Sequence, residues 1–458
     1  MSRCYAWSKA PVWPWKILIL INGPFSRPNN HMIIGIDASR ANRAHKTGTE
    51  WYSYYLIRAL AKIDRDNQYI LYTDKPLRGG LLDLTTTQYE EYEPDRSGDD
   101  DRVGWQEIKS PFNNFRAKIL SWPFYFFWTQ GRLSLEMAKG GVDLLFIPAH
   151  TLPWIHPAKT IVTIHDIGFE RERLLYRYEK MGPESQHGRR LIDFFVRIFT
   201  LNKYGANSLD YLSWSTRFAL KHANRIIAVS EHTKKDIQNI YGTAPDKIAV
   251  VHNGYNDCLF NSDHSSLPRA RIFSKYEIKT PFILYVGRLE KKKNTAALVE
   301  AYANLLASHP GLPHQLVLIG DAGYGYDEVN YAIKELNLDA RVVMPGWAEE
   351  LDLPEIFSAA DLFVFPSQYE GFGLPLLQAM ACQVPVAAAG VSAIPEVAGE
   401  AALYFQPDDV LSMAKAMAEI LTDEKLRRRL IRLGNENIKK YSWDKCARET
   451  LTVFHSLS

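Results

Sequence analysis

The chain has 458 residues, of which 46% are hydrophobic and 23% charged, and its formal net charge is +2. This length implies two or more domains, and the composition excludes a disordered or fibrous chain and a polyanion binder that uses its whole surface. Four scattered cysteines without Cys-x-x-Cys spacing argue against a disulfide framework or structural zinc. The scattered cysteines fit a reducing compartment, and no apolar run approaches the roughly 20 residues of a membrane span, so we expect a cytoplasmic protein. With a net charge near zero, no nucleic-acid partner is expected.

Residues 1–31 are expected to form a variable extension outside the fold, with a functional arm as the alternative. The Trp-rich stretch 13–16 and the short apolar run after it lack the charged start and small-residue cleavage site of a signal peptide. The first convincing element is a strand at 33–37.

From residue 32 to 270 the pattern alternates strands and helices. An amphipathic helix is expected at 50–63. Further strands are expected at 69–73, 142–147, 160–164, 225–229 and 247–251. Alternation at this spacing indicates βαβ units and a largely parallel sheet. The charged stretch 94–101 is expected to be a solvated loop.

Residues 271–440 repeat this plan after a polar boundary at 265–279. Strands are expected at 282–286, 315–319, 341–344 and 362–365, and helices at 294–308, 326–336 and 353–359 and from Pro375 onward. Two doubly wound α/β domains that face each other bind ligands between the carboxyl ends of their strands. The functional site is therefore expected in loops that follow strands.

The most informative of these loops follows the strand at 362–365. It carries Glu370, then Gly371 and Gly373, and Pro375 suits the first turn of a helix. The free N–H groups and the dipole of a helix start favour negative charge, which makes phosphate the natural ligand.

A second charged loop follows the strand at 282–286 in the same half. Arg288 and Lys293 are expected to grip a diphosphate, the arginine as a planar fork and the lysine as a point charge. The alternative is a lysine-rich loop that is merely solvated. The position of the loop after a strand, like that of Glu370, favours the binding site.

The first half offers a glycine at the start of its expected helix. Gly48 follows a basic segment that contains Arg40 and Lys46, and it is expected to let backbone amides meet an anion, with Thr49 as the helix cap. A plain cap beside a flexible loop is the alternative. The dinucleotide fingerprint GxGxxG is absent, which disfavours nicotinamide chemistry.

His165 and Asp166 follow the strand at 160–164. A histidine at the mouth of a cleft can hydrogen-bond a sugar hydroxyl or move a proton near neutral pH, and Asp166 would orient it. The alternative is a structural His-Asp pair. The loop position and the opposing phosphate site favour a function.

Together these motifs resemble family 4 of the retaining glycosyltransferases, also called group 1 glycosyl transferases. The segments that carry the resemblance are 35–38, 46–51, 163–168, 224–231, 287–290, 293–294, 358–367 and 394–397. Single pieces are weakly specific, whereas their order and spacing are strongly specific. The resemblance covers nearly the whole chain from Met32 and implies the GT-B fold, in which two Rossmann-like domains face each other across a cleft.

The resemblance implies a nucleotide-sugar donor site in the second domain. Arg288 and Lys293 would bind the donor diphosphate, and Glu370 would touch the donor sugar as the first acid of a Glu-x7-Glu motif. The cradle would be completed by the backbone of Gly371, Phe372, Gly373 and Leu374.

The resemblance also implies partners for this site in the first domain. His165, beside Asp166, would contact the transferred sugar, and Gly48 would approach the phosphates. Residues 441–458 would form a last helix that crosses back onto the first domain.

The chain departs from the family at two glutamines. The second acid of the motif, usually placed on the donor ribose, is Gln378, and Gln383 replaces a usual glycine. Losing a charge-assisted hydrogen bond is expected to weaken donor binding by roughly 1–2 kcal/mol, about tenfold. Gln383 would be strained if its position requires a positive φ.

The expected activity is transfer of a hexose, of mannose or glucose type, from a nucleotide diphosphate sugar to a hydroxyl of a glycan or lipid-linked acceptor, with retention of configuration. No cofactor or metal is expected, because no Asp-x-Asp motif follows a strand and Arg288 and Lys293 can stabilise the leaving diphosphate. The alternatives are a catalytically silent nucleotide-sugar binding protein and a nucleotide-sugar epimerase of the same fold.

The acceptor is expected to bind the first domain. The aromatic stretch 122–128 and the mixed basic and apolar region 171–225 are interpreted as core helices with solvated outer faces. The alternative is an amphipathic surface that docks on anionic lipid at the inner face of the membrane.

Overall fold

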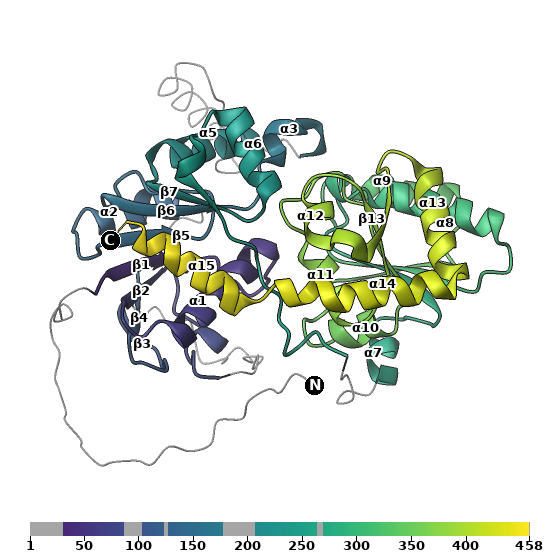
Figure 1. Cartoon of the computed structure of the whole chain (residues 1–458), viewed down its shortest axis with the longest axis horizontal. Helices are drawn as coiled ribbons and strands as arrows, with labels where there is room; N and C mark the ends of the chain where they lie inside the picture. The colour runs from purple at the N-terminus through teal and green to yellow at the C-terminus, as the bar shows by residue number, and fades with distance from the viewer. Residues whose placement is uncertain (1–30, 87–102, 123–126, 177–206, 263–268, 458) are drawn as a thin grey trace, which may run out of the picture.

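The computed structural model describes residues 31–86, 103–122, 127–176, 207–262 and 269–457. Two α/β domains lie side by side, and the last helix runs from the second domain back to the first (Figure 1). The expected extension before residue 31, the charged stretch 94–101, and parts of 122–128 and 171–225 lie outside the described residues.

The first domain is built on an eight-stranded sheet of order β3-β4-β2-β1-β5-β6-β7-β8. Its strands are β1 (Ile33–Asp37), β2 (Gln68–Thr73), β3 (Gly104–Glu107), β4 (Phe115–Ile119), β5 (Leu144–Ile147), β6 (Lys159–Ile164), β7 (Arg225–Ala228) and β8 (Ile248–Val250). All neighbours pair in parallel except β3 and β4. This antiparallel edge was not expected from the sequence.

The helices of the first domain cover both faces of this sheet (Figure 1). They include α1 (Gly48–Ile63), α2 (Ser134–Met137), α3 (Gly168–Arg171), α5 (Ser208–His222) and α6 (Glu231–Tyr241). The expectation that Thr49 caps α1 is wrong. Thr47 is the cap, because its backbone is extended and its N–H donates to the Glu50 carboxylate at 3.2 Å, as in a capping box.

The second domain is built on a six-stranded, fully parallel sheet of order β11-β10-β9-β12-β13-β14. Its strands are β9 (Phe282–Val286), β10 (Gln315–Ile319), β11 (Val342–Gly346), β12 (Leu362–Phe365), β13 (Val386–Ala389) and β14 (Ala402–Phe405). This is the order of a doubly wound dinucleotide-binding fold. The expectation of two Rossmann-like domains is confirmed.

The helices of the second domain follow the expected alternation. They are α7 (Arg269–Lys275), α8 (Thr295–Ser308), α9 (Tyr326–Glu335), α10 (Leu353–Ser358), α11 (Leu374–Ala381), α12 (Ile394–Ala398), α13 (Val410–Thr422) and α14 (Glu424–Asn437). Helix α7 lies in the segment interpreted as a polar boundary. Lys275 and Tyr276 bind Asp352 at 2.8 and 2.7 Å, so this helix packs with the second domain.

The last helix, α15 (Trp443–His455), lies against the first domain, as Figure 1 shows in yellow. Trp443 stacks on Tyr55 of α1 with ring centroids 5.5 Å apart, and Phe454 packs against Phe146 of β5. Gly254 permits this approach, since a Cβ there would lie 2.2 Å from the Trp443 backbone nitrogen. The helix therefore ties the two domains together on one side.

Gln383 occupies the strained position that the sequence pointed to. It follows the end of α11 with a φ of 60°, in the left-handed region that favours glycine. We predict that Gln383→Gly raises the free energy of unfolding by about 1 kcal/mol, because a side chain in this conformation is penalised by that order. Urea unfolding measures the change, and an equal or lower stability would contradict it.

Candidate active site

A pocket of about 370 Å³ opens between the two domains. Its walls are loops at the carboxyl ends of strands: Gly48 after β1, His165 after β6, Arg288 after β9 and Glu370 after β12. In doubly wound sheets this edge is where ligands bind, at the point where strand order reverses. The structure thus brings together loops that lie more than 300 residues apart at their extremes.

All residues expected from the sequence to form the site line this pocket. They are Gly48, His165, Asp166, Arg288, Lys293, Glu370, Gly371, Phe372, Gly373, Leu374 and Gln378. The expected helix start is also present, because α11 begins directly after Gly373, whose φ is 100°. The individual roles of these residues stay predictions.

Lys293 and Glu370 form the most buried ion pair of the pocket. The ammonium lies 2.5 Å from a carboxylate oxygen, and their side chains are only 17% and 9% exposed. The Glu370 N–H donates to the Ser392 hydroxyl at 2.9 Å, which fixes the loop. Arg288 is different, since its side chain is half exposed and lies 3.6 Å from Glu290. Of the two cations expected to grip the diphosphate, Lys293 is therefore largely buried and held by an ion pair, whereas Arg288 is exposed to solvent.

His165 is held as a neutral imidazole. Burial lowers its pKa, and Nε2 lies 2.9 Å from the Pro148 carbonyl oxygen. Because a carbonyl can only accept, Nε2 carries the proton and Nδ1 remains an acceptor. Tyr52 packs edge-on against the ring at 4.8 Å. A neutral imidazole with a free Nδ1 lone pair can accept a hydrogen bond from a sugar hydroxyl, and it is poorly suited to donate a proton as an acid.

The expected orienting contact from Asp166 to His165 is wrong. The His165 ring is oriented by Pro148, whereas an Asp166 oxygen lies 3.7 Å from the Lys292 ammonium and another accepts the Gly168 N–H at 3.2 Å. Burial alone would raise the pKa of Asp166, but the positive charge of Lys292, together with the Gly168 N–H and further nearby groups, outweighs burial and lowers the pKa. The Asp166 carboxylate is therefore charged and forms an ion pair with Lys292 of the second domain.

Sequence reasoning missed Lys292. It lies in a single 3₁₀ turn at Lys291–Lys293, which sends three consecutive lysines in three directions. Lys291 binds Glu328 at 3.0 Å, Lys292 reaches Asp166 of the first domain, and Lys293 reaches Glu370. The run of lysines was visible in the sequence, but their directions depend on the turn.

Sequence reasoning also missed the opposite rim of the pocket. Glu350 and Trp347, in the loop after β11, line the pocket together with Lys46 from the loop before α1. His45 packs edge-on against Trp347 with ring centroids 5.9 Å apart. Burial raises the pKa of Glu350 to about 8, although Lys46 partly opposes the shift. The carboxyl is therefore protonated at neutral pH.

Glu350 should make stability depend on pH. The raised pKa means that the folded protein binds one more proton than the unfolded chain between the ordinary value of 4.5 and about 8. The free energy of unfolding should therefore fall as pH rises through this window. We predict that Glu350→Gln flattens this slope, measured by urea unfolding at pH 5, 6, 7 and 8. An unchanged slope would contradict the prediction.

The described part of the chain shows neither a metal-ligand cluster nor a membrane-spanning helix. Within the described ranges, His, Cys, Asp and Glu side chains do not gather in threes or more as a metal ion would require. In the same ranges, each helix is too short or too polar to span a bilayer. The expectation that the reaction needs no metal ion therefore stays a prediction.

Comparison with known proteins places these features in a family. The model of Glycosyltransferase Family 4 matches residues 46–257, and that of Glycosyl transferases group 1 matches residues 268–437. The chain is 30% identical to O-antigen chain mannosyltransferase B of Escherichia coli over 57% of its own length and 68% of that protein. It is 27% identical to the E. coli serotype-specific mannosyltransferase WbdA over 68% of its length, but spans only 34% of that longer protein.

A solved structure with a similar fold is sucrose-phosphate synthase from Thermosynechococcus elongatus. It superposes with a TM-score of 0.66 at 20% sequence identity and covers 93% of this chain and 99% of its own. At that identity the likeness concerns the fold alone. The expected arrangement of two Rossmann-like domains across a cleft, the GT-B fold, is confirmed.

Proposed function

Because the chain belongs to the group 1 glycosyl transferases, we propose that its interdomain pocket transfers a mannose-type hexose from a nucleotide diphosphate sugar, with retention of configuration. The chain is a glycosyltransferase, and two of its relatives are named mannosyltransferases. The observation that carries the proposal is the buried Lys293–Glu370 pair beside the start of α11, inside a pocket walled by both domains. A silent binding protein and an epimerase are not favoured, because the relatives are named as transferring enzymes.

The proposed reaction breaks the bond between the anomeric carbon and the donor diphosphate. Negative charge grows on the leaving oxygen, and Lys293, Arg288 and the backbone amides of Gly373 and Leu374, which lead into α11, are placed to stabilise it. The acceptor oxygen forms the new bond on the same face, and its proton passes to the leaving diphosphate. Glu370 and the Nδ1 atom of His165 accept hydrogen bonds from hydroxyls of the transferred sugar. In this scheme the cationic side chains of the protein stabilise the leaving diphosphate, which in metal-dependent enzymes is the role of a bound metal ion.

The proposed acceptor is a glycan or lipid-linked glycan bound on the first domain. One relative, which is named for O-antigen chains, supports a polysaccharide acceptor. The first domain also exposes Trp154 and Ile155, whose backbone N–H groups lie 2.8 and 3.4 Å from the Ser134 hydroxyl beside the exposed Leu135. We propose that this apolar patch contacts lipid at the cytoplasmic face of a membrane.

The experiment is a donor panel without added acceptor. Purified protein is incubated with GDP-mannose, UDP-glucose and UDP-N-acetylglucosamine in the presence of EDTA, and release of nucleoside diphosphate is followed. We expect slow hydrolysis of the mannosyl donor, which Lys293→Ala removes and Lys291→Ala preserves. Interconversion of sugars would establish the epimerase instead. Loss of all turnover in EDTA, restored by a divalent ion, would refute the metal-independent scheme.

Gln378 gives a gain-of-affinity prediction. It lines the pocket one helical turn after Pro375, at the position of the family's second acid. We predict that Gln378→Glu tightens binding of the nucleotide sugar about tenfold, because a carboxylate accepts hydrogen bonds from two ribose hydroxyls with charge assistance. Isothermal titration measures it, and an unchanged affinity would mean that this side chain does not face the ribose.

A further inference from the structure

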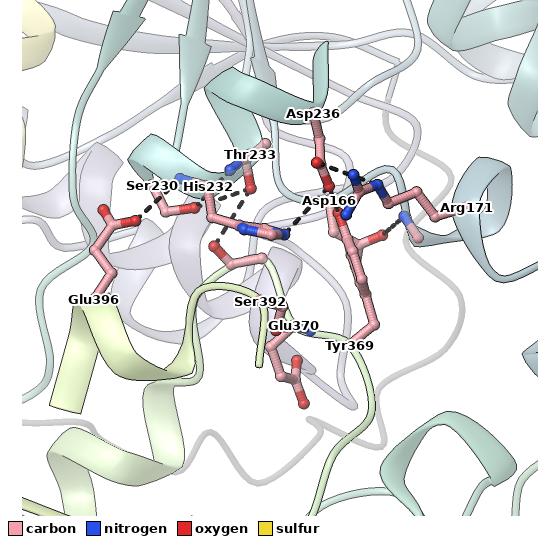
Figure 2. A network of polar contacts seen from close by, with 12 residues as sticks. Asp166, Arg171, Ser230, His232, Thr233, Asp236, Tyr369, Glu370, Ser392 and Glu396 are labelled. Atoms are coloured by element: carbon pink, nitrogen blue, oxygen red, sulfur yellow. Dashed lines mark hydrogen bonds and ion pairs between the residues drawn. The ribbon is translucent and has the colours of Figure 1, made fainter. Parts of the chain in front are cut away.

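Beside the pocket, the two domains also touch along helix α6. Helix α6 of the first domain lies over two pieces of the second, the loop that carries Glu370 and the short helix α12 (Figure 2). The polar side chains of this contact point toward one another across the boundary (Figure 2). None of these contacts follows from the motifs described above.

The start of α6 is capped from both domains. Ser230 of the same domain is its N-cap and accepts the Thr233 N–H at 3.0 Å. Glu396 of the other domain accepts the N–H groups of Glu231 and His232 at 2.8 and 3.0 Å. A carboxylate at a helix start gains from the dipole and from charge-assisted hydrogen bonds. The amides of the first helical turn are thus shared between the domains.

One and a half turns further along α6, Asp236 makes a second link. Its carboxylate is only 2% exposed and accepts the Tyr369 hydroxyl of the other domain at 2.5 Å. Arg171 and His232 of its own domain lie 3.3 Å away. Burial alone would raise the pKa of Asp236, but these contacts outweigh it and lower the pKa. The hydroxyl therefore meets a carboxylate that stays charged.

These links join the two loops that carry the chemistry. Tyr369 immediately precedes Glu370. On the other side, Gly371 packs so closely on His165 that a Cβ there would lie 1.7 Å from the His165 carbonyl oxygen. The Thr233 hydroxyl of α6 lies 3.4 Å from the carbonyl oxygens of both residues. The position of α6 thus sets the spacing between Glu370 and His165.

We infer that α6 is the docking element that holds the domains closed, and that Tyr369, Asp236 and Glu396 are positioning residues for the transfer reaction. The catalytic part of this inference rests on the proposed function. Arg288 and Lys293, the two cations assigned to the diphosphate, belong to the second domain, and Gly48 is the phosphate contact assigned to the first, so nucleotide binding should depend little on docking of the domains. Transfer needs His165 and Glu370 on opposite walls of one site, so it requires the two domains to be docked.

The test compares hydroxyl deletions that differ only in where the lost hydrogen bond ends. Tyr369→Phe breaks the contact between domains, whereas Tyr404→Phe removes a 2.5 Å hydrogen bond to Gly399 within the second domain. Glu396→Gln and the exposed Glu400→Gln form a second matched pair. Each variant is assayed for GDP and UDP affinity, donor turnover and small-angle X-ray scattering.

We expect Tyr369→Phe and Glu396→Gln to lower kcat/KM about tenfold while nucleotide affinity stays within twofold of the wild type. Their radius of gyration should increase, and both controls should match the wild type. Combining Tyr369→Phe with Asp236→Asn should cost no more than the worse single change.

Unchanged turnover and scattering in Tyr369→Phe would overturn the inference. So would a parallel loss of nucleotide affinity and thermal stability, because that pattern indicates a merely structural role. If the wild type turns over no donor, the proposed function fails by itself, and scattering still decides whether α6 holds the domains together.

Discussion

Lys293→Ala is expected to lower the kcat of transfer by about 10²- to 10³-fold, the range seen when one preorganised group that stabilises transition-state charge is removed. Lys293 lies in the pocket wall with its ammonium 2.5 Å from Glu370, so its position is fixed before the donor arrives. The variant loses that charge and also leaves the Glu370 carboxylate, 9% exposed, without its cation. Both the leaving diphosphate and the transferred sugar then lose a contact.

The control for this change is Lys291→Ala. The two lysines belong to the same 3₁₀ turn, but Lys291 pairs with the exposed Glu328 outside the donor pocket. Its removal should leave kcat within twofold of the wild type. Initial rates at saturating donor separate the two variants. A Lys293→Ala enzyme within fivefold of the wild type would contradict the assigned role.

Gly371→Ala is expected to lower donor turnover by about 100-fold. An alanine Cβ at this position would lie 1.7 Å from the His165 carbonyl oxygen and 3.0 Å from Asp166, so backbone of the two domains must move apart. A misplacement of about 1 Å in an active site can cost this much rate. Gly371 lies outside the left-handed region, so the effect comes from the clash across the domain boundary.

Gly311→Ala is the control for the glycine change. Gly311 belongs to a surface connection between α8 and β10, where a Cβ would meet nothing within 4 Å. Its turnover and thermal stability should equal those of the wild type. For Gly371→Ala, steady-state kinetics measure the loss of turnover, and small-angle X-ray scattering measures the separation of the two domains. Wild-type turnover in that variant would show that the close approach to His165 is not needed for catalysis.

How far the sequence predicted the fold depended on burial. Strands β1, β9 and β12 were expected with the observed bounds, because strands covered on both faces read as continuous apolar runs. Strand β4, at Phe115–Ile119, alternates buried and half-buried residues and includes Arg116 and Lys118, so no apolar run marks it. Its neighbour β3 is likewise polar, and its pairing depends on the rest of the sheet.

In the site, too, some features could be predicted from the sequence and others depended on tertiary contacts. Glu370, Arg288 and His165 could be placed in one pocket from sequence because each follows a strand, and parallel strands end at a common edge. Asp166 was assigned the wrong partner. Its carboxylate meets Lys292, a contact that arises only when the two domains meet.

The sequence by itself determined the buried apolar strands, the loops that carry charge and the family, since these depend on local pattern, spacing and residue type. The tertiary structure alone decided that Lys292 pairs with Asp166 of the first domain and that the start of α6 is capped by Glu396 of the second. It also decided that Glu350 faces Lys46 across the opposite rim. These are contacts between chain segments more than a hundred residues apart, and their geometry depends on how two folded domains pack.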